Sequence, residues 1–273
     1  MTAARMAYRT GCQAPTRRGH TGRVKRSAVR PSPLFLSLLA VTVAGAVLTL
    51  FDDSAAALTA GTVLFVLGGW AVSLCLHEFG HAIVAYRGGD HAVRAKGYLT
   101  LDIRRYTDPV FSIVLPLVLL AFGGIPLPGG AVWINHHALR DKRVESMVSL
   151  AGPLSNLALG VLLSLSVILF TPPVGLAAAL SYLAAVQILA FVLNILPIPG
   201  LDGWGAIEPY MSYSARQFGA KARMWAPFVL FAVLIGFPTI GRMFFEAGYT
   251  VFELIGGDRW LAGRGQGTFL FWR

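Results

Sequence analysis

The chain has 273 residues, of which 55% are hydrophobic and only 13% are charged, and its mean hydropathy is +0.63. This balance excludes a soluble globular domain and predicts a polytopic membrane protein. The two cysteines, Cys12 and Cys75, are too few and too unlike in setting for a disulfide framework or a cysteine-rich zinc site. Any metal must therefore be held by histidine and carboxylate.

Residues 1–32 form a basic tail that accounts for most of the net charge of +10. We interpret it as a disordered cytoplasmic arm that fixes orientation by the positive-inside rule and contacts anionic lipid. The tail is rich in arginine and lacks acidic residues, so a nucleic-acid arm and an organelle transit peptide are alternatives. We expect no nucleic-acid partner. We expect a multi-pass protein of the cell membrane with a cytoplasmic N-terminus, or of an organelle membrane if the tail is a transit peptide. Its eight basic residues are Arg5, Arg9, Arg17, Arg18, Arg23, Lys25, Arg26 and Arg30.

Two apolar stretches follow the tail. The first, Leu34–Phe51, is long enough to cross a bilayer, and Asp52 and Asp53 mark its exit on the far side. The second runs from about residue 61 to residue 86 and ends at Arg87, the first of several basic residues. By the same charge rule the second stretch returns to the cytoplasmic side.

The second stretch contains the pentapeptide His77-Glu78-Phe79-Gly80-His81. Histidines four apart lie on one helix face, so the two imidazoles can share a metal ion with Glu78 beside them as a base. A chance pair of histidines packed in a helix bundle is the plain alternative. It is disfavoured, because each ionisable group within a span costs about 2.5 to 3.5 kcal/mol and usually marks function. Gly69 and Ser73 continue the histidine stripe and favour close helix packing.

Residues 109–134 are apolar enough to cross the membrane, but they end in a run dense in glycine and proline that cannot continue a helix. A full crossing would put the next loop, with Arg140, Lys142 and Arg143, outside, against the positive-inside rule. A segment that enters as a helix and returns as extended chain keeps that loop in the cytoplasm. We therefore interpret residues 109–134 as re-entrant.

Three later spans are predicted at Met147–Phe170, Val174–Leu196 and Trp225–Phe245. Beyond Glu246 the apolar pattern weakens and predicts at most an interfacial or short membrane helix. The spans together indicate an all-α polytopic membrane protein with about five to six transmembrane helices. We divide it into the tail at 1–32, a first helix and outer loop at 33–60, a core at 61–205 and a C-terminal helix and tail at 206–273.

A catalytic zinc with two histidines and a water needs one more protein ligand. Asp202 is the candidate, because it directly follows an apolar span whose helix is broken by Pro197 and Pro199. A routine Asp-Gly turn is the alternative. If residues 109–134 are re-entrant, Asp202 lies on the cytoplasmic side with His77 and His81, whereas a full crossing would put it on the opposite side.

Other polar groups lie at the same level. The run Gly152-Pro153-Leu154-Ser155-Asn156 begins the span after the basic loop and offers an amide near the site. His136 and His137 are rival ligands, but no predicted span presents them beside the pentapeptide, so we expect them to be solvated.

Three motifs together, H-E-x-x-H at 77–81, G-P-x-x-N at 152–156 and N-x-x-P-x-P-x-x-D-G at 194–203, resemble the site-2 protease family of intramembrane zinc metalloproteases. The likeness is to its compact bacterial branch without a PDZ insert and covers roughly residues 65–205. Leu99-Thr100-Leu101 and Asp108-Pro109 also fit that branch. This chain differs at Gly200, where relatives often carry proline, at Trp204, where glycine is common, and at Asp102, where asparagine is more usual.

The resemblance implies a site-2 protease-like helical core in which one Zn²⁺ ion is held by His77, His81 and Asp202. It also implies that Glu78 is the catalytic base and that Asn194 and Asn156 lie beside the site to steady substrate or oxyanion.

The implied activity is hydrolysis of peptide bonds in transmembrane segments of a single-span membrane protein, as in regulated intramembrane proteolysis. The substrate helix must unwind before attack, and residues 124–134 offer an edge for the unwound strand. The expected partners are that substrate and the lipid bilayer, and a homo-oligomer is compatible with the sequence. The alternatives are a catalytically inactive membrane scaffold of the same fold and a metal transporter. Glu78 argues against a scaffold, and motifs that occur only once argue against a transporter built from repeats.

Overall fold

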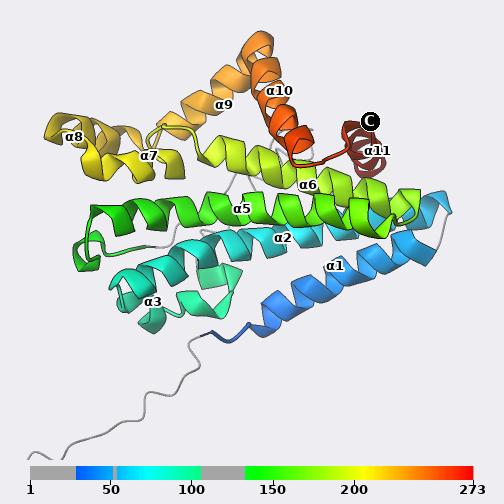
Figure 1. Ribbon diagram of the computed structural model, residues 1–273, viewed down its shortest axis with the longest axis horizontal. Helices are drawn as coiled ribbons and strands as arrows, with labels where there is room; N and C mark the ends of the chain where they lie inside the picture. The colour runs from blue at the N-terminus through cyan, green and yellow to red at the C-terminus, as the bar shows by residue number, and fades with distance from the viewer. Residues whose placement is uncertain (1–28, 52–53, 106–132, 273) are drawn as a thin grey trace, which may run out of the picture.

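The computed structural model describes residues 29–51, 54–105 and 133–272, which form helices joined by loops (Figure 1). The basic tail as far as residue 28 and nearly all of the predicted re-entrant segment, residues 106–132, lie outside the described residues. The helix-and-return path of that segment and its strand-pairing role therefore stay predictions.

Four of the described helices are long and apolar enough to cross a membrane: α1 (Pro33–Phe51), α2 (Ala55–Gly88), α5 (Lys142–Phe170) and α6 (Val174–Asn194). A fifth candidate is the pair α8 (Tyr213–Ala222) and α9 (Ala226–Gly236), which is bent by 68°. In Figure 1 the four long helices lie side by side in the order α1, α2, α5, α6. The prediction of an all-α polytopic membrane protein is confirmed.

The long helices approach one another closely where one of them carries glycine. Gly69 of α2 faces Leu183 of α6, and a methyl group added at Gly69 would come within 2.5 Å of the leucine side chain. Gly160 of α5 lies against Ile188 of α6 in the same way, at 2.6 Å. The predicted close-packing stripe of α2 is therefore confirmed at Gly69. Small residues serve this purpose in membranes because they let two helix backbones come together.

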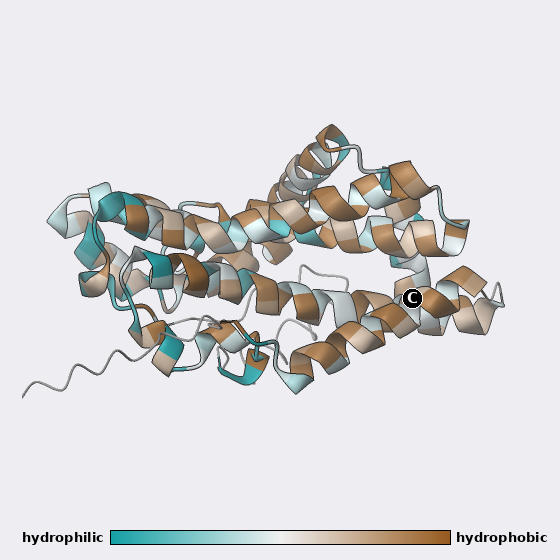
Figure 2. Cartoon of the chain, turned by 60° about the horizontal axis from the view of Figure 1, so that its bottom comes forward, coloured by the Kyte–Doolittle hydropathy of each residue, from teal (hydrophilic) through white to brown (hydrophobic). Residues whose placement is uncertain are grey.

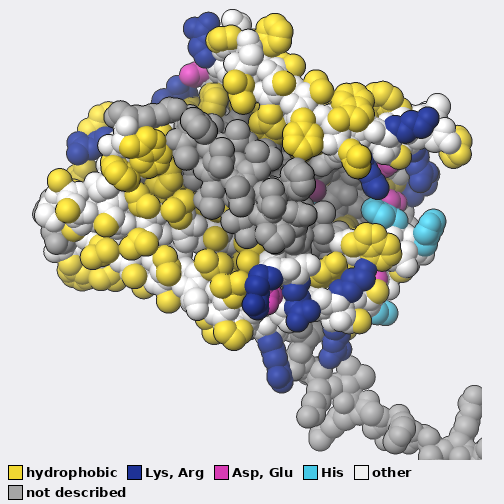
Figure 3. Space-filling view, turned by 180° about the vertical axis from the view of Figure 1, so that it is seen from behind, with side chains coloured by type: hydrophobic (Ala, Val, Ile, Leu, Met, Phe, Trp, Pro, Cys, Tyr) yellow, Lys and Arg dark blue, Asp and Glu magenta, His cyan; other side chains and the backbone are white. Residues whose placement is uncertain are grey.

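Hydrophobic residues, brown in Figure 2, run along the long helices, and many of those on α1 and α5 are exposed, as expected for surfaces that face lipid. Seen from behind in Figure 3, hydrophobic side chains cover much of the left of the molecule, whereas the histidines lie at the right and many of the Lys and Arg side chains lie at the right and lower right. That end of the bundle carries the short helices α3 (Ala92–Ala95), η1 (Tyr98–Thr100), η2 (Ile103–Arg105) and η4 (His136–Ala138).

The two flanks of the 106–132 segment meet at this same end. The buried carboxylate of Asp90 accepts hydrogen bonds from the backbone N–H of Ala92, at 3.0 Å, and of Asn135, at 2.8 Å. Lys96 lies 3.5 Å from the centre of the Trp133 ring, and its backbone carbonyl accepts a hydrogen bond from Arg105. The described residues on either side of the 106–132 segment thus lie at one end of the bundle.

The C-terminal region corrects one prediction. The single span predicted at Trp225–Phe245 is wrong, because α9 ends at Gly236 and α10 (Pro238–Leu254) begins after a break at Phe237. A residue before proline is disfavoured in the helical conformation, and Phe237 accordingly has φ −120° and ψ 89°. The two helices form the inverted V above α6 in Figure 1.

The last helix, α11 (Arg259–Phe269), packs against α6. Asp258, which interrupts the apolar pattern in the sequence, caps α11 by accepting a hydrogen bond from Leu261 N–H. Arg259 forms ion pairs with Glu246 and Glu253 of α10, at 3.0 and 2.9 Å. Asp258 therefore marks the start of α11, and Arg259 links this helix to α10. The periodicity of apolar residues in the sequence did not predict the position of this helix.

Gly265 of α11 lies directly on the backbone of α6, where a Cβ atom would overlap the Ala178 carbonyl. We expect Gly265→Ala to lower the unfolding temperature of the purified protein, since a backbone oxygen cannot move aside cheaply. Gly267→Ala on the same helix is the matched control, because a Cβ atom there meets nothing within 4 Å. The control should raise stability by about 0.5 to 1 kcal/mol through helix propensity. Equal effects of the two substitutions would contradict the packing described.

Candidate metal centre

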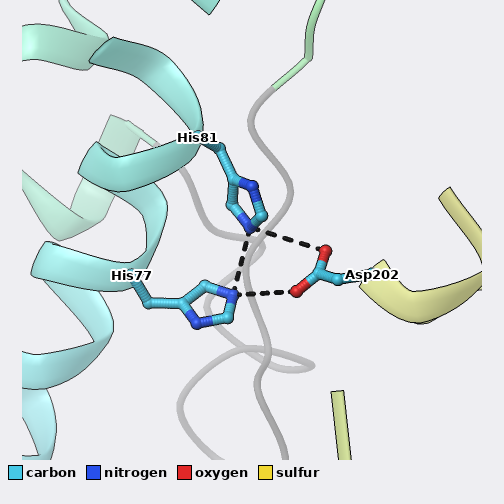
Figure 4. Close-up of side chains that lie close together, drawn as sticks. All are labelled: His77, His81 and Asp202. Atoms are coloured by element: carbon cyan, nitrogen blue, oxygen red, sulfur yellow. Dashed lines mark hydrogen bonds and ion pairs between the residues drawn. The ribbon is translucent and has the colours of Figure 1, made fainter. Parts of the chain in front are cut away.

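Three predicted ligands converge where α2 meets the start of α7 (Asp202–Ile207), as Figure 4 shows. His77 and His81 lie on one face of α2, both buried, and their Nε2 atoms are 3.1 Å apart. Asp202 Oδ2 lies 3.2 Å from His77 Nε2, and Asp202 Oδ1 lies 3.5 Å from His81 Nε2. The possible ligand atoms of the three residues all lie within 4.8 Å of one another, so the group is compact enough for a single metal ion.

The loop between α6 and α7 aims Asp202 at the histidines. The helix α6 ends at Asn194, ahead of Pro197 and Pro199, and Gly200 then adopts φ +94°. Only glycine takes that conformation readily, so a proline could not replace Gly200 in this turn. Asp202 opens α7, and Gly203 sits so close to the Ile195 carbonyl that a Cβ atom would overlap it. The Asp-Gly pair thus shapes a turn and places the Asp202 carboxylate beside the histidines.

The opposite ring nitrogen of each histidine is held by α5. His77 Nδ1 lies 2.9 Å from Asn156 Oδ1, and His81 Nδ1 lies 2.7 Å from the backbone oxygen of Val148. The Val148 oxygen can only accept, so His81 Nδ1 carries the hydrogen and donates it, and His77 Nδ1 does the same with the Asn156 oxygen turned toward it. Each Nε2 is then left with a lone pair that faces Asp202. Outer hydrogen bonds of this kind are a usual feature of metal-binding histidines.

The electrostatics of the cluster call for a cation. A carboxylate that holds a metal ion is ionised, and a histidine that holds one is neutral. Two nitrogen lone pairs and a carboxylate then face one another in a low-dielectric setting, where such groups repel strongly. A shared cation relieves that repulsion, and two imidazoles with one carboxylate are a known set of ligands for catalytic zinc.

Gly152 of α5 provides the space for this arrangement. A Cβ atom at Gly152 would overlap His81 Nε2 and come within 2.6 Å of His77 Nε2. Gly80 of α2 lies close to the backbone of α5, where a Cβ atom would be 2.8 Å from the Ala151 carbonyl. Sequence reasoning found the Gly152–Asn156 motif but missed this steric role. It also missed Val148, because a backbone acceptor leaves no mark in the sequence.

The remaining predicted site residues lie as follows. Glu78 is 2% exposed and follows His77 directly on α2. Asn194 is buried, and its side-chain amide donates to the Ala190 carbonyl one turn earlier, at 3.0 Å. Asn156 contacts His77, as described above. The chemical roles of all three toward substrate stay predictions.

The two rival ligands lie apart from the cluster. His136 and His137 are both exposed on η4, and His136 pairs with Glu145 at 2.7 Å. Within the described part of the chain, the one group of three or more possible ligand side chains is His77, His81 and Asp202.

Two of the departures from the family pattern have local compensations. The Trp204 ring lies against α8 at Gly219, where a Cβ atom would collide with the indole. The Asp102 carboxylate receives hydrogen bonds from Arg104, at 2.8 and 2.9 Å, and the guanidinium holds the pKa of that carboxyl below its usual range. Neither residue belongs to the ligand cluster.

Comparison with known proteins agrees with this geometry. The chain is 45% identical over 252 residues to "Putative zinc metalloprotease Rip2" of Mycobacterium tuberculosis strain H37Rv, covering 91% of this chain and 96% of the relative. The protein of the same name from Mycolicibacterium smegmatis is 43% identical over 90% of this chain and 96% of its own length. "Putative zinc metalloprotease YwhC" of Bacillus subtilis is 31% identical over 61% of this chain and 78% of its own length.

No family model and no solved structure matches the chain. The two Rip2 relatives nevertheless match along about 90% of the chain, and all three relatives carry the name that the ligand cluster leads one to expect. The chain belongs to the site-2 protease family of zinc metalloproteases.

Proposed function

We propose that this protein is an intramembrane zinc protease that hydrolyses peptide bonds within the membrane-spanning segment of single-span membrane proteins. The observation that carries the proposal is the convergence of the Asp202 carboxylate with the Nε2 atoms of His77 and His81, which lie on a helix long and apolar enough to span a bilayer. The names of the relatives support the metal and the class of reaction. The apolar helices around the site support a substrate that lies in the membrane.

His77, His81 and Asp202 would hold the metal, which when bound supplies a Lewis acid and lowers the pKa of a water molecule toward about 7. Glu78 accepts the proton of the attacking water on its carboxylate and delivers it to the nitrogen of the leaving amine. Asn156 fixes the His77 ring through its Nδ1 hydrogen bond. Asn194 lies at the end of α6, eight residues before Asp202, and is the proposed contact for substrate or oxyanion.

We further propose a multi-pass protein of the cell membrane whose N-terminus and site-bearing end face the cytoplasm. The charge distribution supports this orientation, because α2 ends and α5 begins among basic residues at the site-bearing end. The start of α1 lies at that end too, since Ser32 N–H donates to the Thr100 carbonyl at 2.8 Å. The basic tail therefore leads into the bundle on the side that the positive-inside rule assigns to the cytoplasm.

The variants Glu78→Gln and Asp202→Ala distinguish the role of the catalytic base from that of a metal ligand. With purified protein reconstituted beside a single-span substrate, Glu78→Gln should keep its zinc and lose cleavage by about 10²- to 10⁴-fold, the range typical of a general base. Asp202→Ala should lose zinc and cleavage together. Zinc is measured by elemental analysis and cleavage by gel.

His137→Ala is the matched control for these variants, because it removes an exposed histidine outside the cluster and should change neither quantity. Full cleavage by Glu78→Gln would refute the assigned base. Metal-dependent ion flux without cleavage in the wild type would refute the protease and favour a transporter.

Gly152→Ala should abolish zinc binding although it adds only a methyl group, because that methyl group would occupy the space in front of both Nε2 atoms. We expect a zinc content near that of Asp202→Ala, with the protein still folded by circular dichroism. Gly263→Ala on α11 is the control, since a Cβ atom there meets nothing within 4 Å. Normal zinc content in Gly152→Ala would show that the ligands do not meet at this point.

A further inference from the structure

A small cavity lies against one of the proposed metal ligands, His77. It has a volume of about 20 Å³, enough for one water molecule, and its walls include His77, Asn156, Gln187 and Ser73. It adjoins a larger, mostly apolar cavity of about 200 Å³, because Ser73 and Gln187 line both. Both partners of the hydrogen bond that orients the His77 ring thus line the small cavity, whereas Asp202 does not.

Gln187, which lines this cavity, has an unsatisfied polar atom. Its side chain is 1% exposed, and among the described residues its Oε1 atom has no hydrogen-bond partner. A buried carbonyl oxygen without a partner costs about 1 to 3 kcal/mol, so buried polar atoms are nearly always paired with protein or with water. A cavity large enough for one water molecule, with this acceptor and an amide in its walls, meets the requirements of a buried water site.

The orientation of the Asn156 amide matters to the metal centre. With its oxygen toward His77, Asn156 accepts the Nδ1 hydrogen and leaves a lone pair on Nε2. With the amide turned over, its NH₂ group would face Nδ1, the ring would carry its hydrogen on Nε2, and that atom would be blocked as a ligand. Neither the His77 contact nor the shape of the side chain selects between these two arrangements, because an imidazole can adopt either tautomer.

We propose that Gln187, in the orientation that leaves its Oε1 atom unpaired, is a positioning residue that favours the metal-binding arrangement through one buried water in this cavity. The water donates a hydrogen to Gln187 Oε1 and accepts one from the Asn156 amide nitrogen. The Asn156 oxygen is thereby held toward His77, and the His77 hydrogen is held on Nδ1. The inference rests on the proposed zinc site and adds a residue of α6 to the control of a ligand on α2.

The test replaces the acceptor oxygen and keeps the volume. Gln187→Met has nearly the same length and shape but cannot accept the water's hydrogen, so we expect zinc affinity, measured by chelator competition on the full-length protein, to fall about 10-fold. Gln187→Glu keeps an oxygen at the same place and should retain wild-type affinity. Ser164→Ala is the matched control, since Ser164 Oγ is also buried and has no partner among the described residues, but Ser164 does not line the cavity.

Cleavage kinetics distinguish positioning from a merely structural role. At limiting zinc, Gln187→Met should cleave more slowly in proportion to its lower occupancy, and at saturating zinc its kcat and KM should return to wild-type values. A general loss of packing would lower kcat at every zinc concentration and would also lower the unfolding temperature. If Gln187→Met does not fold, Gln187→Leu replaces it, with the same expectation.

Wild-type zinc affinity in Gln187→Met would overturn this inference and leave the proposed function intact. An equal loss in Gln187→Glu or Ser164→Ala would overturn it as well, because the acceptor oxygen would then not be the cause. A wild-type protein that binds no zinc would instead overturn the proposed function, and the inference would fall with it.

Discussion

The metal centre depends on one electrostatic constraint, which is that two histidine lone pairs and an ionised carboxylate face one another inside a helix bundle. Such an arrangement is unfavourable without a shared cation, and it persists only when the surrounding chain fixes each ligand separately. Three elements do so here. The helix α2 sets the spacing of His77 and His81, α5 fixes both rings by their Nδ1 atoms, and the loop after α6 delivers Asp202.

The close crossing of α2 and α5 makes this possible. Gly152 lies against both Nε2 atoms and Gly80 against the α5 backbone, so the two helices approach at the level of the ligands. The same approach puts Val148 and Asn156 within hydrogen-bond distance of the rings. A larger residue at the crossing would separate the histidines from the groups that orient them. The glycines thus serve packing and the metal site at once, as small residues often do in membrane helices.

The sequence predicted those parts of the fold that depend on local pattern. Long apolar runs gave α1, α5 and α6 within a few residues, and the H-E-x-x-H spacing gave two ligands on one helix face. Asp202 emerged from charge topology, because the positive-inside rule placed it on the same side as the histidines. The prediction of a single span at Trp225–Phe245 was wrong, because it followed the many apolar residues and did not allow for the helix break that Pro238 imposes at Phe237. Val148 and Gln187 gave no local signal, because their importance comes only from the neighbours that tertiary packing brings to them.

X-ray absorption at the zinc edge of the purified wild-type protein tests the central claim most directly, since it reads the ligand atoms themselves. The account predicts one zinc per chain, with two imidazole nitrogens at about 2.0 to 2.1 Å and oxygen ligands at about 2.0 to 2.2 Å. A signal with three or more imidazoles, a thiolate sulfur at about 2.3 Å, or a protein that retains no zinc would contradict it.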